Sequence, residues 1–362
     1  MQREIGSDFW LNPHEKYVEN KEIKLAKYGI NGEDYVLLST GRSAEKMVLE
    51  TIEKRNPNIE KIALIPPYTC ETVIQPFVTL GYKIHTYRID DYLNATPEML
   101  KEDIHNSKAQ VVLFHRYFGF DTFEKCAFVI KEAREKGIIF IEDRTQNLYS
   151  KQLDLEVDYT IGSFRKWAGL TDGGFAVCKE GLFSKKTDIY DTKLEQSKLR
   201  ASYLKYSYME QFEGYKQKFL EEYKKAEDIL CSEISYYSMS PMAQKIQVSL
   251  DLKSLKQRRQ ENYKKVFEEL DSCKEIVSIT PQISDNDVPL YYVILVKDRI
   301  KLQEKLRKYD IYAPIVWPMS DLGIDICDTA KNIHENVLCL PIDQRYGIDD
   351  MERMIECVKK EI

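Results

Sequence analysis

The sequence predicts an α/β protein with a mostly parallel central sheet covered by helices, followed by a smaller C-terminal α/β domain. Short apolar runs alternate with amphipathic helical stretches between residues 35 and 178. Continuous apolar strands separated by crossover helices are typical of parallel sheets that are buried on both faces. A shorter alternation of the same kind follows after residue 290. The 362 residues, 43% of them hydrophobic, suffice for about two domains.

The first alternating region contains seven expected strands. They cover residues 35–38, 61–66, 83–89, 110–115, 138–143, 158–163 and 174–179. Between them, helices are expected at 41–55, at 70–80, after Pro97 and at 123–137. The first of these helices has Met47, Val48 and Ile52 at helical spacing, and the last is stopped by Gly137.

The remaining segments complete the expected organisation. Residues 182 to about 232 are charged and Tyr-rich, which predicts helices that are either solvated or in contact with a partner or substrate. A long helix is expected at 241–271. After it come strands at 291–297, 311–317 and 336–341, with helices at 299–309 and 349–360. The predicted division is an N-terminal arm at 1–34, a large domain at 35–240 and a small domain at 241–362.

Composition excludes several classes of protein. The net charge of −6 disfavours non-specific nucleic-acid binding, and no apolar run approaches the length of about 20 residues that spans a bilayer. Eight cysteines are too dilute for a disulfide scaffold, and because none form C-x-x-C we expect no metal site. Reduced thiols and an N-terminus without a secretory apolar core favour a cytoplasmic protein.

Two groups of polar residues lie where ligands bind in such sheets, beyond the carboxyl ends of the strands. Gly41, Arg42 and Ser43 follow a strand and open a helix. Free backbone N–H groups there favour a phosphate, with Ser43 as donor and Arg42 as cation. A serine helix cap beside a glycine turn is the alternative. Asp143 follows a buried strand, where it either holds a protonated ring nitrogen or caps the next segment.

The third group is Gly162-Ser163-Phe164-Arg165-Lys166, after another strand. A neighbouring cation and desolvation both favour a neutral amine, so Lys166 is a candidate nucleophile with a lowered pKa. A surface basic pair is the alternative. His115 and Arg345 are further candidates, for contact with a ligand and for gripping a carboxylate; a satisfied strand-end histidine and a surface arginine are their alternatives.

The order of these groups resembles fold type I pyridoxal-phosphate (PLP) enzymes, and more narrowly the DegT/StrS-type sugar aminotransferases. The resemblance covers residues 35–180 and continues to the C-terminal LCLPIDQRYGIDDMERMIECV. Thr40-Gly41-Arg42-Ser43-Ala44 is similar to the family's Ser-Gly-Thr-x-Ala phosphate loop, and IEDRTQ is similar to its Glu-Asp-x-x-Gln. HRYFG resembles its His-x-Tyr-Gly strand end.

The resemblance implies a role for each matching residue. Gly41, Arg42, Ser43 and Ser163 would bind the phosphate of PLP, and Lys166 would form the Schiff base. Asp143 would contact the pyridinium nitrogen, and Gln146 would lie near the 3′ oxygen. Tyr68 would stack on the ring, because Cys70 stands where many relatives carry an aromatic residue.

The function implied is amino transfer from an amino-acid donor to a keto-sugar or related keto acceptor, with Lys166 and Asp143 as the catalytic pair. Freed Lys166 would move the proton, while ionised Asp143 would keep the cofactor ring protonated. The resemblance also implies a homodimer. A PLP lyase or desulfurase that uses the same lysine, and a non-catalytic relative with a binding or regulatory role, are the alternatives. A nicotinamide enzyme is disfavoured, because no G-x-G-x-x-G follows the first strand.

Overall fold

A seven-stranded sheet forms the centre of the computed structural model, which describes residues 3–151, 153–210, 213–231 and 236–362. The strand order is β2 (Asp34–Leu38), β8 (Gly174–Cys178), β7 (Tyr159–Ser163), β6 (Ile139–Asp143), β5 (Val111–His115), β3 (Ile62–Ile65) and β4 (Lys83–Thr86). All neighbours from β7 to β4 pair in parallel, and only β8 runs antiparallel to both of its partners. The mostly parallel sheet expected from the sequence is therefore confirmed.

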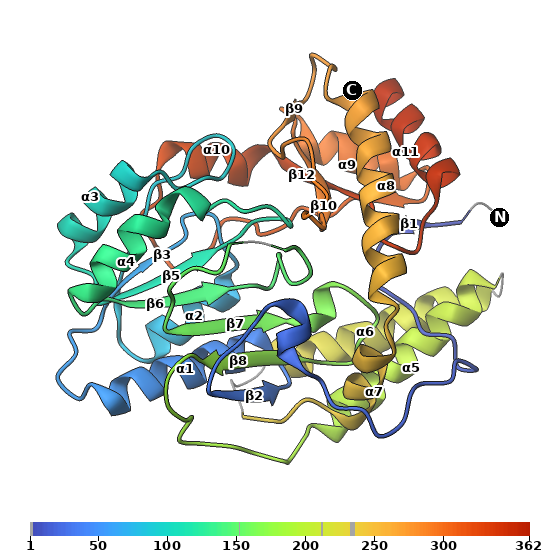
Figure 1. Cartoon of the computed structure of the whole chain (residues 1–362). Helices are drawn as coiled ribbons and strands as arrows, with labels where there is room; N and C mark the ends of the chain where they lie inside the picture. Colours follow the sequence, from blue (N-terminus) through green and yellow to red (C-terminus); the bar gives the residue numbers. More distant parts are fainter. Residues whose placement is uncertain (1–2, 152, 211–212, 232–235) are drawn as a thin grey trace.

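Helices cover both faces of this sheet (Figure 1). Side chains alternate along a strand, so Val111 and Leu113 of β5 pack in one core and Val112 and Phe114 pack in another. The first core includes α1 (Gly41–Arg55) and α2 (Glu71–Thr79). The second includes α3 (Pro97–Ser107) and α4 (Ala127–Glu135), which follows the 3-10 turn η2 (Glu124–Cys126). Burial on both faces explains why these strands read as unbroken apolar runs.

A smaller α/β unit lies above one end of the sheet (Figure 1). Its antiparallel sheet has the order β12 (Val337–Pro341), β10 (Tyr291–Leu295) and β9 (Val277–Ser278). Its helices are α8 (Leu252–Leu270), α9 (Arg299–Arg307), α10 (Asp328–Asn336) and α11 (Ile348–Glu361). The N-terminal β1 (Ile5–Gly6) pairs in parallel with β11 (Ile311–Tyr312), so the first residues are held by the last third of the chain. The boundaries at residues 34 and 240 stay a prediction.

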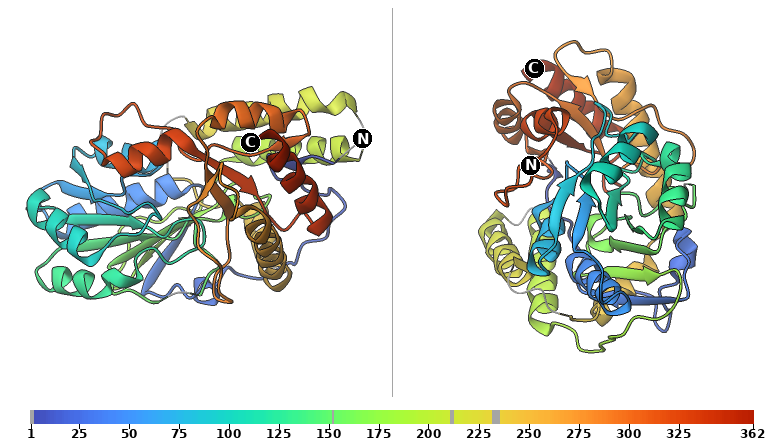
Figure 2. Two further views of the ribbon diagram at one scale, coloured as in Figure 1. Left: turned by 90° about the horizontal axis from the view of Figure 1, so that it is seen from above. Right: turned by 90° about the vertical axis from the view of Figure 1, so that its left-hand side faces the viewer.

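Two antiparallel helices project beyond the carboxyl ends of the parallel strands. They are α5 (Thr192–Met209) and α6 (Lys216–Cys231), joined through η4 (Glu213–Tyr215). Figures 1 and 2 show them side by side, next to the N-terminal arm that runs through η1 (Leu25–Tyr28). We call this pair the α5–α6 hairpin. It confirms helices in the Tyr-rich segment, of which residues 211–212 and 232–235 lie outside the described part.

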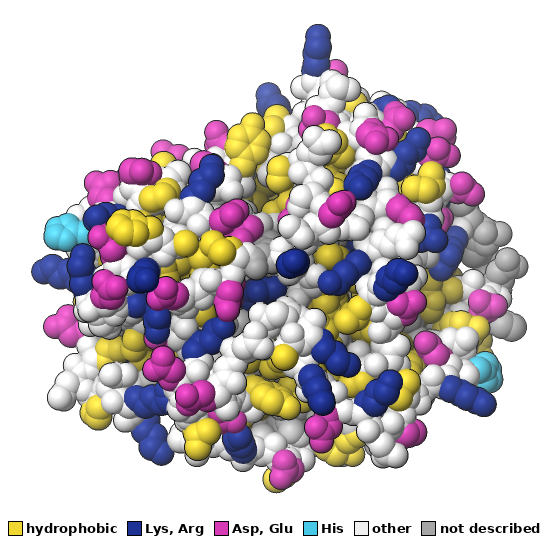
Figure 3. Space-filling model, viewed as in Figure 1, with side chains coloured by type: hydrophobic (Ala, Val, Ile, Leu, Met, Phe, Trp, Pro, Cys, Tyr) yellow, Lys and Arg dark blue, Asp and Glu magenta, His cyan; other side chains and the backbone are white. Residues whose placement is uncertain are grey.

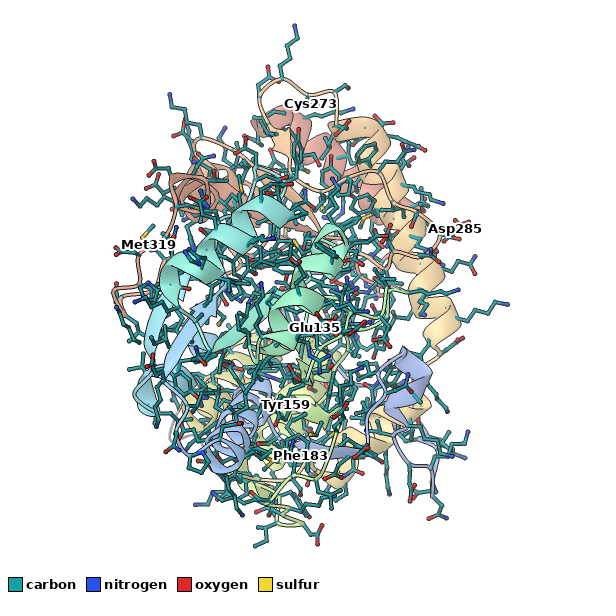
Figure 4. All side chains as sticks on the ribbon, turned by 60° about the vertical axis from the view of Figure 1, so that its left-hand side comes forward. Glu135, Tyr159, Phe183, Cys273, Asp285 and Met319 are labelled. Carbon is teal, nitrogen blue, oxygen red and sulfur yellow. The ribbon has the colours of Figure 1, made fainter. Side chains whose placement is uncertain are left out.

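Several predicted elements have different bounds in the structure, and three of the differences have a clear physical cause. The helix expected from residue 182 begins only at 192, because the preceding segment runs along edge strand β2. There the Phe183 amide donates to Asp34 Oδ2 at 2.9 Å, and the Phe183 ring lies 6.4 Å from that of Tyr159. Figure 4 shows these two residues near each other.

The long helix expected at 241–271 is two helices, α7 (Pro241–Ser249) and α8. Leu250 is extended, and the Asp251 side chain accepts hydrogen bonds from the Lys253 and Ser254 amides, which starts a second helix. The strand expected at 311–317 is only two residues long, because it meets Pro314 and then Trp317, whose φ of 59° is incompatible with a strand. The exposed Met319 in Figure 4 belongs to the loop that follows.

The surface is mixed in charge. Basic, acidic and apolar side chains are interspersed over the face shown in Figure 3. Among the described residues, we find no helix with the length and apolarity needed to cross a bilayer.

Candidate active site

The sheet topology brings the candidate residues to one edge. His115 ends β5, Asp143 ends β6 and Ser163 ends β7, and these three strands are parallel neighbours. His115 pairs in register with Asp143, and Asp143 pairs with Ile161. The turn after β7, η3 (Phe164–Lys166), then carries Lys166 over the same edge. Residues about 50 positions apart in the chain therefore meet beyond the strand ends, where such sheets bind ligands.

The start of α1 lies directly against β7 and β8. A Cβ built on Gly41 would lie 3.6 Å from Ser163 Cβ, so the helix start and Ser163 are in contact. A Cβ on Gly174 would lie 2.3 Å from the Thr40 carbonyl carbon, which explains a glycine at the start of β8. This packing places the free N–H groups of a helix N-terminus beside a serine hydroxyl, a combination that suits a phosphate.

The N-cap of α1 is Thr40, not the serine that the sequence offered as the alternative to a phosphate site. The Ser43 amide donates to Thr40 Oγ1 at 3.0 Å, and the two hydroxyl oxygens lie 2.8 Å apart. Ser163 Oγ donates to the Gly173 carbonyl at 3.2 Å. The Arg42 guanidinium donates to Gln75 Oε1 at 2.8 Å and to the Leu230 carbonyl, so it ties α1 to α2 and α6. Its role toward a phosphate stays a prediction.

Asp143 is buried and held in its ionised form. Burial by itself would raise its pKa, but a hydrogen bond and charge interaction with His115, together with hydrogen bonds from Thr145, outweigh burial and lower it. His115 Nδ1 lies 3.2 Å from Asp143 Oδ2, and the Thr145 amide donates to Oδ1 at 2.8 Å. On the far side, His115 Nε2 lies 2.6 Å from Thr69 Oγ1. Because a carboxylate only accepts, Nδ1 carries the proton, and His115 orients the acid.

Lys166 faces a pocket of about 490 Å³ and is exposed within it. The crowding of surrounding protein lowers the pKa of its amine, and the neighbouring Arg165 and Lys198 lower it further. Cys70 and Glu227 act in the opposite direction. The predicted direction of the pKa is therefore found, for the two reasons given from the sequence.

Two predicted cofactor contacts are engaged with other parts of the chain. Gln146 Oε1 accepts a hydrogen bond from the Phe118 amide at 3.0 Å, which fixes the side chain against the loop after β5. Tyr68 is fully buried, donates to the Val316 carbonyl and packs its ring 5.3 Å from Trp317. The ring beside Asp143 is instead that of His115, which in turn lies 5.3 Å from Trp317. Both cofactor roles stay predictions.

The pocket beyond Lys166 is bordered by parts of the chain outside the strand–helix alternation of residues 35–178. Its walls come from the N-terminal arm, the α5–α6 hairpin and the small α/β unit. Arg345 donates to the carbonyls of Ser7 and Asp8 at 3.1 and 3.0 Å and pairs with Asp343 at 2.7 Å. It therefore clamps the arm and is not a free surface arginine, and its role toward a carboxylate stays a prediction. Lys205 of α5 also donates to the Asp8 carbonyl.

Sequence reasoning also missed Glu45. This α1 residue is 1% exposed, and burial, followed by the charge of Asp143, raises its pKa well above the ordinary value. The one signal in the sequence is that this acid stands beside the apolar residues Ala44 and Met47, which α1 buries.

Comparison with known proteins places these features in context. The model of the DegT/DnrJ/EryC1/StrS aminotransferase family matches residues 3–359. Among curated proteins no sequence matches significantly.

Three of the similar solved structures cover nearly the whole chain at low identity. The structure of PseC from Helicobacter pylori, described as an aminotransferase involved in the biosynthesis of pseudoaminic acid, has a TM-score of 0.69, 14% identity and 99% coverage of both chains. Sugar aminotransferase CalS13 from Micromonospora echinospora has a TM-score of 0.65 at 15% identity, covering 93% of this chain and 92% of its own.

The third is the putative sugar aminotransferase Spr1654 from Streptococcus pneumoniae, solved in a PLP-form. It has a TM-score of 0.66 at 15% identity, covering 93% of this chain and 90% of its own. At these identities the three structures show the fold.

Proposed function

The chain belongs to the DegT/DnrJ/EryC1/StrS aminotransferase family, and from this premise we propose that it uses PLP to move an amino group from an amino acid to a keto sugar. The carrying observation is the convergence of Asp143, Lys166 and the start of α1 at one edge of the sheet. The sugar acceptor is supported by the solved relatives, which include a sugar aminotransferase and an enzyme of pseudoaminic acid biosynthesis.

The donor set present fits PLP. A pyridine nitrogen that must stay protonated needs an ionised carboxylate, and Asp143 is kept ionised by His115. An aldehyde needs an amine that is neutral near working pH, and the pKa of Lys166 is lowered. A phosphate needs N–H and O–H donors, a role that we assign to the start of α1, Ser43 and Ser163. In this proposal Gly41, Arg42 and Gln146 complete the contacts, and Tyr68 is the ring that stacks on the cofactor.

The chemistry follows from what each residue can do. Bound PLP supplies an electron sink next to the carbon that loses its proton. Asp143 holds the proton on the ring nitrogen through its ionised carboxylate. Nζ of Lys166 would hold the cofactor and, when released and neutral, would take the proton from the α carbon of the donor and deliver it to the former aldehyde carbon of the cofactor. The N-terminal arm and the α5–α6 hairpin line the pocket that this amine faces.

A visible absorption spectrum tests the function. The purified protein with PLP should show the band of lysine-bound cofactor, and added glutamate should convert it to the spectrum of the amino form, with one equivalent of keto acid released. A nucleotide-linked keto sugar should restore the first spectrum. Release of sulfide or alanine from cysteine, without the glutamate half-reaction, would contradict amino transfer.

Homodimeric assembly and a cytoplasmic location are also part of the proposal. The family resemblance supports the first. All eight cysteines lie among the described residues and are unpaired, which supports a reducing compartment. Light scattering of the purified protein should give twice the chain mass of 42.5 kDa; a monomer mass would remove the dimer.

A further inference from the structure

The α5–α6 hairpin brings a carboxylate to the pocket that Lys166 faces. Glu227 of α6 and Lys198 of α5 line this pocket together with Arg165 and Lys166. The first two come from a helical segment outside the strand–helix alternation, and the last two from the turn after β7. Four charged side chains from two separate parts of the chain therefore share one cavity with the candidate reacting amine.

Glu227 is fixed in place by two cations. Its Oε1 lies 2.5 Å from Nζ of Lys198 and 3.7 Å from Nη1 of Arg165. The Lys198 side chain is only 9% exposed, and its Nζ lies 5.3 Å from the Tyr223 ring. A buried ammonium needs a counter-ion, so this pairing is expected to persist in solution. The carboxylate is therefore anchored on the inner side of the hairpin, although it is still half exposed to the pocket.

The charges do not cancel. Arg165 and Lys198 contribute two positive charges, and Glu227 contributes one negative charge, so the group adds about one net positive charge beside Lys166. We propose that Glu227 is a positioning residue for amino transfer: by neutralising part of the charge of Arg165 and Lys198, it sets the charge state in which Lys166 meets cofactor and substrate. This inference rests on the proposed function, because it takes Lys166 as the lysine that holds PLP.

The groups around Lys166 act on the pKa of its amine in both directions. The crowding of surrounding protein and the charges of Arg165 and Lys198 lower the pKa of this amine, while Cys70, at the start of α2, and Glu227 raise it. The influence is mutual, since the cations Arg165, Lys198 and Lys166 together overcome burial and lower the pKa of Glu227. Glu227 therefore stays ionised and opposes the cations.

The test is a pH titration of the visible band of the PLP-loaded protein, which reports the charge on the lysine-bound nitrogen without turnover. In Glu227→Gln the midpoint should move to lower pH by about 0.5 to 1 unit, because a negative charge is lost. In Lys198→Met it should move to higher pH by a similar amount. Glu227→Asp keeps the negative charge, so its midpoint should stay close to the wild-type value. Asp228→Asn is the matched control, because Asp228 is the exposed neighbouring acid and does not line the pocket.

Opposite shifts in the two variants support the proposal, because a merely structural role would not reverse sign with the charge removed. Midpoints that stay at the wild-type value, or that move in the same direction, overturn it. If one variant does not fold, the sign of the shift in the other decides. Absence of a visible band in the wild type is a different result, since it removes the proposed function itself.

Discussion

Two groups of residues meet at Lys166 and differ in how they are built. The first group, which we call the inner wall, consists of the strand-end residues His115, Asp143 and Ser163 with Lys166, and of these Lys166 also lines the pocket. They lie on neighbouring strands, so the fold itself fixes their proximity. The outer wall consists of the arm and the α5–α6 hairpin. It depends on contacts between distant residues, such as Arg345 with Asp8, 337 positions apart. In the proposed function, the inner wall would carry the chemistry and the outer wall would adjust its charge environment.

The largest difference between inner-wall and outer-wall substitutions is expected when Lys166 is replaced. Lys166→Ala should lose the visible PLP band and at least about 10³-fold in turnover, because both the anchoring amine and the base are removed. Lys198→Ala, which removes another pocket lysine but on the outer wall, should keep the band and lose less than about tenfold. Turnover and spectra of the two variants are the measurement, and equal losses would break the comparison.

Asp143 is the second inner-wall residue to test. Asp143→Asn should bind PLP more weakly and lose about 10²-fold in turnover number, since a neutral amide cannot keep the ring nitrogen protonated. His115 would also lose the carboxylate that it now contacts at 3.2 Å. Steady-state kinetics at saturating PLP measure the effect. A turnover number equal to that of the wild type would take Asp143 out of this role.

An outer-wall substitution should instead act on stability. Arg345→Gln leaves the buried Asp343 without its cation and frees the arm, which should lower the free energy of unfolding by about 3 kcal/mol. Urea denaturation measures the loss, and limited proteolysis should cut the arm faster. Arg345→Lys keeps the positive charge but not the two-pronged guanidinium, so it should recover only part of the lost free energy of unfolding. An arm as resistant as in the wild type would show that Arg345 is not its clamp.

The smallest effect is expected at the buried Asp172, whose carboxylate accepts a hydrogen bond from the Ser240 amide. Burial raises its pKa to about 7, against hydrogen bonds from Ser240 that lower it. The folded state thus keeps a proton that the unfolded chain loses near pH 4, so stability should fall as pH rises from about 4 to about 7. Asp172→Asn should flatten this fall, by about 1 to 2 kcal/mol between pH 5 and 7. Thermal melts across this range measure it; parallel curves for both proteins would contradict the assignment.

The inner wall could be predicted from the sequence because each of its residues follows a readable strand. Asp143 ends the run 138–143 and Lys166 lies in the turn that follows the run 158–163, and parallel pairing then brings strand ends together. The site roles themselves remain predictions, because sequence order cannot say where a side chain points. Tyr68 shows this, since its hydroxyl bonds to the Val316 carbonyl 248 residues away.

The outer wall could not be predicted, because its partners leave no local pattern. Glu227 and Lys198 occur in a charged helical segment where many acids and lysines look alike, and only the packing of α5 on α6 selects this pair. In the sequence Arg345 likewise looks like a loop arginine, and only the folded structure brings it to the Ser7 carbonyl of the arm. Helix breaks such as that at Leu250 are set by a single cap, Asp251, inside an otherwise helical pattern.

The most direct measurement of the central claim is to identify the lysine that holds the cofactor. Borohydride reduction of the PLP-loaded protein fixes the cofactor to its lysine, and mass spectrometry of the digested protein then locates the label. We expect the label on Lys166. Lys205, buried and with a pKa lowered to about 7 by burial and Arg345, is the internal competitor, as is Lys198. A label on either of these outer-wall lysines would contradict the account.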